Sequence, residues 1–286
     1  MTELSMRRAR TAELGSQRSF RSWYDQAWKL LALPLIIFFL LPVAAIFLRL
    51  TPEAILTSLQ SGMVLQAVQL SLFTSLCTVA LTIVLGTPLA YLVYRRRSRF
   101  SRLVDTLIDL PTVLPPAAAG VALLIAFGRQ GLVGGVLADL GISLPFTTAA
   151  VILAQTFIAA PLYIKSASLG FGSVDCEIKK AAALDGASRW QVVRYIVLPM
   201  SWMSLVSGAI MTWARALGEF GATMIFAGNL AGRTQTMPLA IYLGFELDLE
   251  VALTLSAILI LISFISLLVL KWFLHTNDTS LELEDR

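Results

Sequence analysis

Two opposite charges, Arg215 and Glu219, stand in a stretch that is otherwise uncharged from Tyr195 to Gly232. Ionisable side chains are costly inside a membrane and usually mark a function or a specific partner. Four residues apart on a helix, these two can pair on one face. They can form a structural ion pair that joins helices. Alternatively, Arg215 can guide an anion, with Glu219 weakening an attraction that would otherwise trap it.

A second feature is the group of prolines Pro111, Pro115 and Pro116 in another apolar segment. Proline lacks a backbone N–H and interrupts the hydrogen bonds of a helix. Inside a membrane, the freed carbonyl groups must be paired or face a water-filled cavity. The prolines therefore predict either a kink that fits neighbouring helices or a broken helix that lines a transport path. The candidate residues of such a path or its gate are Pro115, Pro116, Arg215, Glu219 and Thr223.

A third feature is residues 171–199, a polar connection rich in small residues between two apolar segments. Ala181–Ala183 favour a helix with a nearly bare surface, and Asp185-Gly186 predicts a turn after it. Ser188 can cap a second short helix. Such a helix–turn–helix can seat closely in a groove of a partner, although an ordinary amphipathic connection would share the pattern. The candidate docking residues are Glu177, Lys180, Ala181, Ala182, Asp185, Gly186 and Ala187.

The sequence carries no pattern for a metal site or for binding ATP. His275 is the single histidine, and Cys77 and Cys176 lie far apart in the chain, so no set of metal ligands is expected. The Gly-x-x-x-x-Gly-Lys-Ser/Thr pattern of a P-loop does not occur. We expect no cofactor and no catalytic residue in this chain, and any ATP must be bound by a partner subunit.

The composition places these features in a membrane protein. Of the 286 residues, 57% are hydrophobic and 14% are charged, whereas soluble domains carry about 25% charged residues. A helix needs about 20 apolar residues to cross a bilayer, and no segment alternates as a membrane strand would. The sequence predicts an all-α polytopic protein with six spans, near residues 28–49, 68–94, 104–128, 146–168, 200–226 and 251–273.

Basic residues predict the orientation of these spans. Most of the 22 Lys and Arg residues fall near the N-terminus, in the connection 95–102 and in or near the loop 171–199. The positive-inside rule assigns these segments to the cytoplasm. We expect cytoplasmic tails at residues 1–27 and 275–286 and a transmembrane domain at residues 28–274. The long polar start does not fit a cleavable signal, and topology explains the net charge of +4 without a nucleic-acid partner.

The loop carries Ala181-Ala182, Gly186 and then Ile196-x-Leu198-Pro199. This spacing resembles the cytoplasmic "EAA" loop of ABC importer permeases, where such subunits grip their ATPase partner. The resemblance implies the same contact for residues 177–198. The family usually has Glu at the position of Lys180. Glu177, three residues earlier and on the same helical face, is expected to supply the carboxylate instead.

A second resemblance narrows the family. The stretches Leu110–Pro116, Trp213–Thr223 and Ala227–Leu239 are similar to molybdate permease subunits of the sulfate/molybdate oxyanion group. The resemblance covers residues 60–275. It implies a type I ABC importer permease fold and a homodimer in the bilayer of a prokaryotic inner membrane. It also implies two ABC ATPase subunits and an external oxyanion-binding protein as partners.

Other functions share part of this pattern. Permeases for sulfate, thiosulfate or tungstate resemble the molybdate permeases closely, so the transported ion stays open. A stand-alone secondary transporter or channel is an alternative from a different class. That alternative should show inverted repeats or chains of membrane carboxylates, and the sequence has neither.

Overall fold

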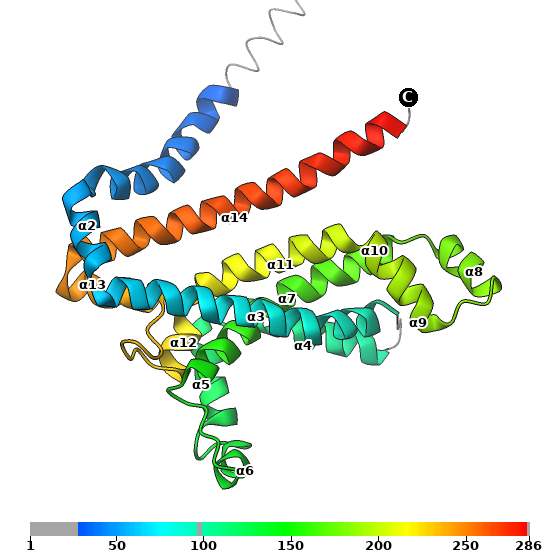
Figure 1. The fold of residues 1–286 in the computed structure, drawn as a ribbon, viewed down its shortest axis with the longest axis horizontal. Coiled ribbons are helices and arrows are strands. Elements are labelled where there is room, and N and C mark those ends of the chain that lie inside the picture. The colour runs from blue at the N-terminus through cyan, green and yellow to red at the C-terminus, as the bar shows by residue number, and fades with distance from the viewer. Residues whose placement is uncertain (1–27, 96–98, 285–286) are drawn as a thin grey trace, which may run out of the picture. The chain divides into compact units, whose positions relative to one another are not determined.

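The computed structural model describes residues 28–95 and 99–284, and every regular element within them is a helix. The chain divides into two compact units, Met1–Thr51 and Pro52–Arg286. The first unit contributes the helix Trp28–Arg49. The second unit (Figure 1) contains α2 (Pro52–Gln60), α3 (Gly62–Arg95), α4 (Arg99–Val113), α5 (Pro116–Phe127), α6 (Gly134–Asp139), α7 (Thr148–Ser173), α8 (Cys176–Leu184), α9 (Arg189–Val192), the π-helix η1 (Val193–Val197), α10 (Leu198–Met200), α11 (Trp202–Leu217), α12 (Gly221–Phe226), α13 (Met237–Leu247) and α14 (Leu249–Glu284).

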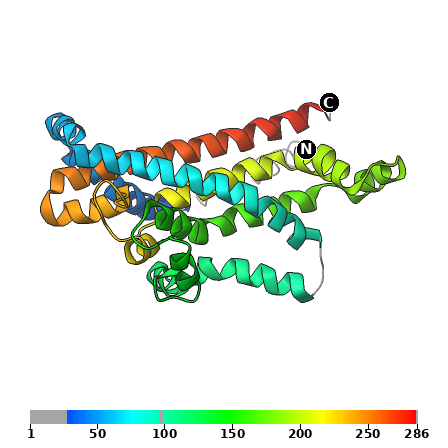
Figure 2. The ribbon, with the colours of Figure 1, turned by 60° about the horizontal axis from the view of Figure 1, so that its bottom comes forward.

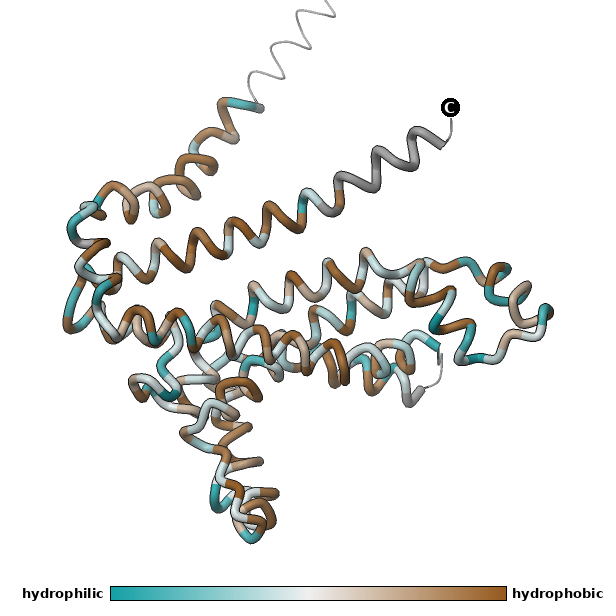
Figure 3. Tube along the Cα trace, viewed as in Figure 1, coloured by the Kyte–Doolittle hydropathy of each residue, from teal (hydrophilic) through white to brown (hydrophobic). Residues whose placement is uncertain are grey.

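Four of the described helices are long and apolar enough to cross a membrane: Trp28–Arg49, α3, α7 and the Leu249–Trp272 part of α14. Two bent pairs add to these. Helix α4 joins α5 at an angle of 118°, and the helix Arg189–Met200 joins α11 at 68°. With each pair counted as one span, the number reaches the six predicted from the sequence. Apolar residues cover much of α14 (Figure 3), as contact with lipid requires.

Helices α3, α7 and α11 pack side by side through small residues (Figures 1 and 2). A Cβ on Gly170 of α7 would lie 2.5 Å from Ser204 of α11, and one on Gly208 of α11 would lie 2.8 Å from Ser166 of α7. Small residues let helix backbones approach closely, which is how membrane helices associate. Helix α3 turns inward a row of buried small residues spaced three or four apart: Ser71, Ser75, Thr78, Thr82, Gly86 and Ala90.

The third span is broken, which is one of the two outcomes that its prolines predicted. Helix α4 ends at Val113 and α5 begins at Pro116, with Pro115 as the residue before the first turn of α5. The first helical position suits proline because the N–H there has no partner within the helix. Few backbone hydrogen bonds are therefore lost at the break. Helix α5 leaves it in a different direction from α4 (Figure 1).

The fifth span is not the single helix that was predicted for residues 200–226. Helix α11 ends at Leu217, the chain leaves helical geometry at Gly218–Phe220, and α12 begins at Gly221. A second bend follows the π-helix η1, at Ser201. The apolar composition concealed both changes of direction, because an apolar run of this length fits one straight helix as well as a bent or interrupted one.

Helices α5 and α12 approach each other through one glycine from each. A Cβ on Gly120 of α5 would lie 2.9 Å from the carbonyl oxygen of Ala222, and one on Gly221 of α12 would lie 2.8 Å from Cβ of Pro116. These distances are too short for any larger residue. The two helices that follow the two breaks are thus held together by backbone contact.

We predict that Gly120→Ala lowers the melting temperature of the purified subunit. Alanine favours a helix, but forcing its methyl group against the Ala222 backbone should cost about 1–3 kcal/mol. The matched control is Gly135→Ala in α6, where no atom lies within 4 Å of the added Cβ. Equal melting temperatures for the two variants would show that the α5–α12 contact is not tight.

Candidate functional site

Arg215 and Glu219 form the ion pair that the sequence predicted, with Nη1 of Arg215 2.9 Å from Oε2 of Glu219. The expected geometry was wrong in one respect. The two do not lie on one face of a helix, because α11 ends between them at Leu217. The side chain of Glu219 is 1% exposed, whereas that of Arg215 is 37% exposed. The carboxylate is therefore buried in protein and the guanidinium reaches open space.

The buried carboxylate of Glu219 also organises the break in the chain. Its Oε1 accepts a hydrogen bond of 2.9 Å from the backbone N–H of Ala222, in the first turn of α12. Thr223, a predicted path residue, is fully buried in α12, and its hydroxyl donates to the carbonyl of Phe220 at 2.9 Å. Glu219 thus joins the end of α11 to the start of α12, and Thr223 supports that turn instead of lining open space.

A cavity of about 180 Å³ lies beside this pair. Arg215 is the one charged side chain in its lining among the described residues. A cavity of this size has room for several water molecules, and a partly neutralised guanidinium in an apolar wall attracts a small anion. The lining comes from the broken span, α7 and α11, through Pro111, Thr112, Leu114, Pro116, Ile158, Leu162 and Arg215.

Gln155, which the sequence analysis did not single out, fixes the neighbouring end of α11. Its side chain is 1% exposed. The Nε2 of Gln155 donates to the carbonyl of Ala216 at 3.1 Å, and its Oε1 accepts from the Thr78 hydroxyl of α3 at 3.1 Å. A freed carbonyl at a helix end within the membrane needs such a donor. The sequence offered one signal for this residue, a glutamine within an apolar segment, which indicates a polar side chain that binds a buried backbone group.

A second ion cluster connects the broken span to α7. Nζ of Lys165 lies 2.6 Å from Oδ1 of Asp105 and 2.9 Å from Oδ2 of Asp109. The two aspartates are one turn apart on α4 and so share a face. Lys165 thus ties α7 to the part of α4 that leads to Pro111, a residue of the cavity lining.

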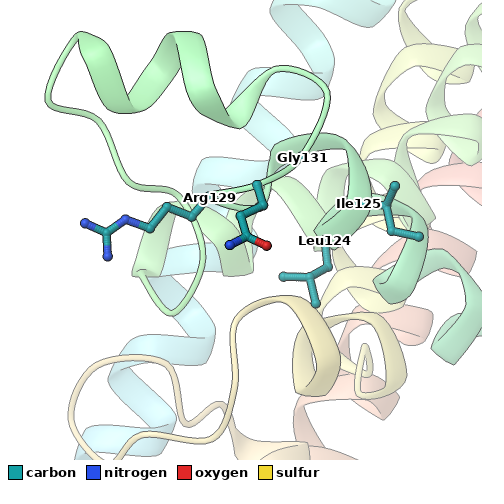
Figure 4. Close-up of a pocket in the computed structure, with 6 residues that line it drawn as sticks. Leu124, Ile125, Arg129 and Gly131 are labelled. Atoms are coloured by element: carbon teal, nitrogen blue, oxygen red, sulfur yellow. The ribbon is translucent and has the colours of Figure 1, made fainter.

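A larger hollow, about 390 Å³, lies at the far end of α5 (Figure 4). It is lined by Leu124, Ile125 and residues 128–131, and the side chain of Arg129 points away from the two apolar residues. The loop folds back on α5, with the N–H of Leu132 donating to the carbonyl of Ile125 at 3.1 Å. Its polar side chains are those of Arg129 and Gln130 from one exposed loop, whereas the Arg215 cavity is lined by several packed helices, so we place the candidate site at the Arg215 cavity.

The small-residue connection forms the helical hairpin that its sequence predicted. Helix α8 ends at Leu184, and Gly186 turns the chain with a φ of +88° that favours glycine. Ser188 caps α9, with its hydroxyl accepting from the N–H of Gln191. The α8–α9 hairpin (residues 176–192) extends beyond the ends of α7 and α11 (Figures 1 and 2).

The surface of the hairpin is open, and it combines small residues with exposed apolar side chains such as Leu184 and Trp190. None of the nine residues of α8 is buried. All seven predicted docking residues are exposed or half-buried: Glu177, Lys180, Ala181, Ala182, Asp185, Gly186 and Ala187. Glu177 lies in the first turn of α8, one turn before Lys180, and its proposed substitution for the family glutamate stays a prediction. The described residues contain no group of three or more His, Cys, Asp or Glu that could hold a metal ion.

Residues 82–276 match the family of binding-protein-dependent transport system inner membrane components. The chain belongs to this family. The matched range includes the broken span, both residues of the Arg215–Glu219 pair and the whole docking hairpin. The family assignment agrees with the resemblance found in the sequence, and it establishes the chain as an inner membrane transport component.

Named relatives within this family cover most of the chain. The molybdenum transport system permease protein ModB of Mycobacterium tuberculosis is 39% identical over 228 residues, which is 80% of this chain and 86% of that protein. ModB of Escherichia coli K12 is 36% identical over 210 residues, which is 72% of this chain and 92% of that protein.

Solved ABC transporters share the fold. The structure of an inward-facing MetNI methionine ABC transporter matches with a TM-score of 0.59 at 18% identity, covering 75% of this chain and 95% of that one. The structure of a bacterial alginate ABC transporter in complex with an alginate pentasaccharide-bound periplasmic protein matches with a TM-score of 0.70 at 18% identity, covering 91% and 95%. These likenesses confirm the expected type I importer permease fold.

We predict different outcomes for Arg215→Ala alone and for the pair Arg215→Ala and Glu219→Gln. The single change leaves a buried carboxylate without its cation and should cost on the order of 3 kcal/mol. The double change removes both charges and keeps an oxygen for the Ala222 amide, so the melting temperature should largely recover. Arg102→Ala, at an exposed arginine of α4, controls for the loss of a positive charge.

Transport measured on the same proteins separates the two roles of the pair. If Arg215 guides an anion, the double variant is stable but transports little of the anion. Arg215→Lys then keeps part of the anion uptake, because lysine retains the positive charge but lacks the planar guanidinium. Full recovery of both stability and uptake in the double variant would contradict the anion-guide hypothesis and show that the pair is purely structural.

Proposed function

We propose that this chain is the permease subunit of an ABC importer that carries molybdate across the membrane. The observation that supports the substrate best is the 39% identity to a molybdenum permease along 80% of the chain. The Arg215 cavity suits such a substrate, because a tetrahedral oxyanion can accept hydrogen bonds from a guanidinium in a largely apolar wall. Glu219 offsets part of the charge, so the anion is attracted without being trapped.

The energy comes from ABC ATPase subunits that bind ATP, and this chain catalyses no covalent step and holds no cofactor. The ATPases dock on the α8–α9 hairpin, whose small exposed residues allow close approach. Closure of the ATPases on ATP moves the hairpin and switches the cavity between the two sides of the membrane. An external oxyanion-binding protein delivers the substrate, and selectivity resides largely in that protein.

The assembled importer contains two copies of this chain, and both termini face the cytoplasm of a prokaryotic cell. The concentration of basic residues in the predicted inner segments supports this orientation. A membrane-impermeant thiol reagent added to intact cells should therefore miss Cys176, which is exposed at the start of α8. Labelling of Cys176 from outside would contradict this orientation and place the α8–α9 hairpin on the outer side of the membrane.

The proposed function is tested by reconstituting the subunit with its ATPase in vesicles that hold the external binding protein. ATP-dependent uptake of molybdate, and weaker uptake of sulfate, is the expected result. A preference for sulfate or tungstate would support the proposed importer class but contradict molybdate as its substrate. Uptake that proceeds without ATP or an ATPase would instead establish a secondary transporter or channel.

For docking, we predict that Ala182→Arg abolishes copurification of the ATPase while the membrane domain keeps its melting temperature. Ala182 is half-buried on α8, and a long charged side chain there prevents close approach of a partner. Ala138→Arg, at an exposed alanine of α6, is the matched control and should assemble normally. Normal assembly of the Ala182 variant would remove the hairpin from the ATPase contact.

A further inference from the structure

Lys179 connects the docking hairpin to the membrane bundle. It lies on α8, between the predicted docking residues Glu177 and Lys180, but it points toward the bundle. Its Nζ donates a hydrogen bond of 2.7 Å to the hydroxyl of Tyr94 in α3 and one of 3.5 Å to the carbonyl of Phe171 in α7. The ammonium also lies 5.0 Å from the centre of the Tyr94 ring. These contacts matter because α8 buries none of its own side chains.

Tyr94 is itself held firmly in place. Its ring lies 3.6 Å from the position that a Cβ on Gly172 would occupy, so the ring packs against the backbone at the end of α7. The Tyr94 ring centre is also 6.3 Å from that of Tyr91, and Tyr91 meets the buried ring of Phe171 edge to face at 5.9 Å. A displacement of Lys179 therefore acts on a packed aromatic group and not on a free side chain.

The helix that carries Tyr94 continues to the residues that flank Arg215 in the chain. Thr78 lies 16 residues earlier on α3, about 24 Å along the helix axis. There α3 contacts Trp213 directly and reaches Ala216 through Gln155 of α7. Ser75 accepts a 2.9 Å hydrogen bond from the indole of Trp213, and Thr78 binds Gln155, which in turn binds the carbonyl of Ala216. One helix thus touches the hairpin at one end and, nearer its other end, the part of α11 that carries Arg215.

From these contacts we propose that the Lys179–Tyr94 contact is the joint through which movement of the docking hairpin reaches α3 and, through α3, the Arg215 cavity. Lys179 and Tyr94 are positioning residues that touch neither ATP nor the substrate. The proposal rests on the proposed function, since it specifies how the ATPase drives this permease. It predicts that loss of the joint leaves assembly intact and separates ATP hydrolysis from transport.

The test compares Lys179→Met, Tyr94→Phe and their combination in reconstituted vesicles, with oxyanion uptake divided by ATP hydrolysed as the readout. Lys179→Met should lower this ratio about tenfold, the size expected for losing a charged hydrogen bond with its ring contact. Tyr94→Phe should lower it less, and the double variant should match Lys179→Met because both changes remove one interaction. Lys179→Arg should restore part of the ratio, and Lys271→Met, at an exposed lysine of α14, should leave it unchanged.

A second measurement tests the joint without ATPase or substrate. Backbone hydrogen exchange on the isolated subunit should become faster in α8 for Lys179→Met and stay the same in α7 and α11. Unchanged exchange in α8, an unchanged uptake ratio, or fully additive effects in the double variant would each overturn the proposal. Failure of the wild-type protein to transport molybdate would instead contradict the proposed function, and the exchange result for the joint would still stand.

Discussion

The buried carboxylate of Glu219 is the interaction on which the central part of this structure depends. A chain that leaves helical geometry within a membrane bundle exposes backbone groups that lipid cannot satisfy. Here Glu219 accepts from the Ala222 amide and pairs with Arg215, while Gln155 donates to the carbonyl of Ala216. With these partners in place, the break between α11 and α12 is stable. The same pairing holds a half-exposed guanidinium at the edge of a cavity.

The two broken spans support each other. Pro115 and Pro116 lie at the break between α4 and α5. Gly218 is the C-cap of α11 and lies at the break before α12. Gly120 and Gly221 then let α5 and α12 approach to backbone contact. Neither short helix could cross a bilayer alone, so each depends on the other and on α7 for packing. Because the breaks lie side by side, the cavity between α4, α7 and α11 is lined by prolines and by Arg215.

The sequence predicted the elements whose signals are local. The turn at Gly186 and the cap at Ser188 depend on single residues with strong backbone preferences, and the structure confirms both. At Pro115 the sequence allowed either a kink or a break, and the structure shows a break. The Arg215–Glu219 pair was predicted from its spacing. Its geometry was not, because the (i, i+4) spacing assumes a continuous helix and α11 ends at Leu217, between the two residues.

Contacts between distant segments were beyond the sequence patterns. The Thr78–Gln155 hydrogen bond and the Lys165 cluster join residues at least 56 positions apart. Helix packing brings these residues together, and nothing in the spacing along one segment specifies which side chains will meet. The roles of the docking residues stay predictions for the same reason, since their partner surface belongs to another protein.

The central claim is that the Arg215 cavity lies on the translocation path and changes sides during the ATP cycle. It is tested most directly by the access of a membrane-impermeant thiol reagent to Thr112→Cys, a cavity-lining position, in a chain that also carries C77S and C176S. The account predicts labelling from one side of the membrane without nucleotide and from the other side when ATP holds the ATPases closed. Labelling from the same side in both states, or from neither side, would contradict it.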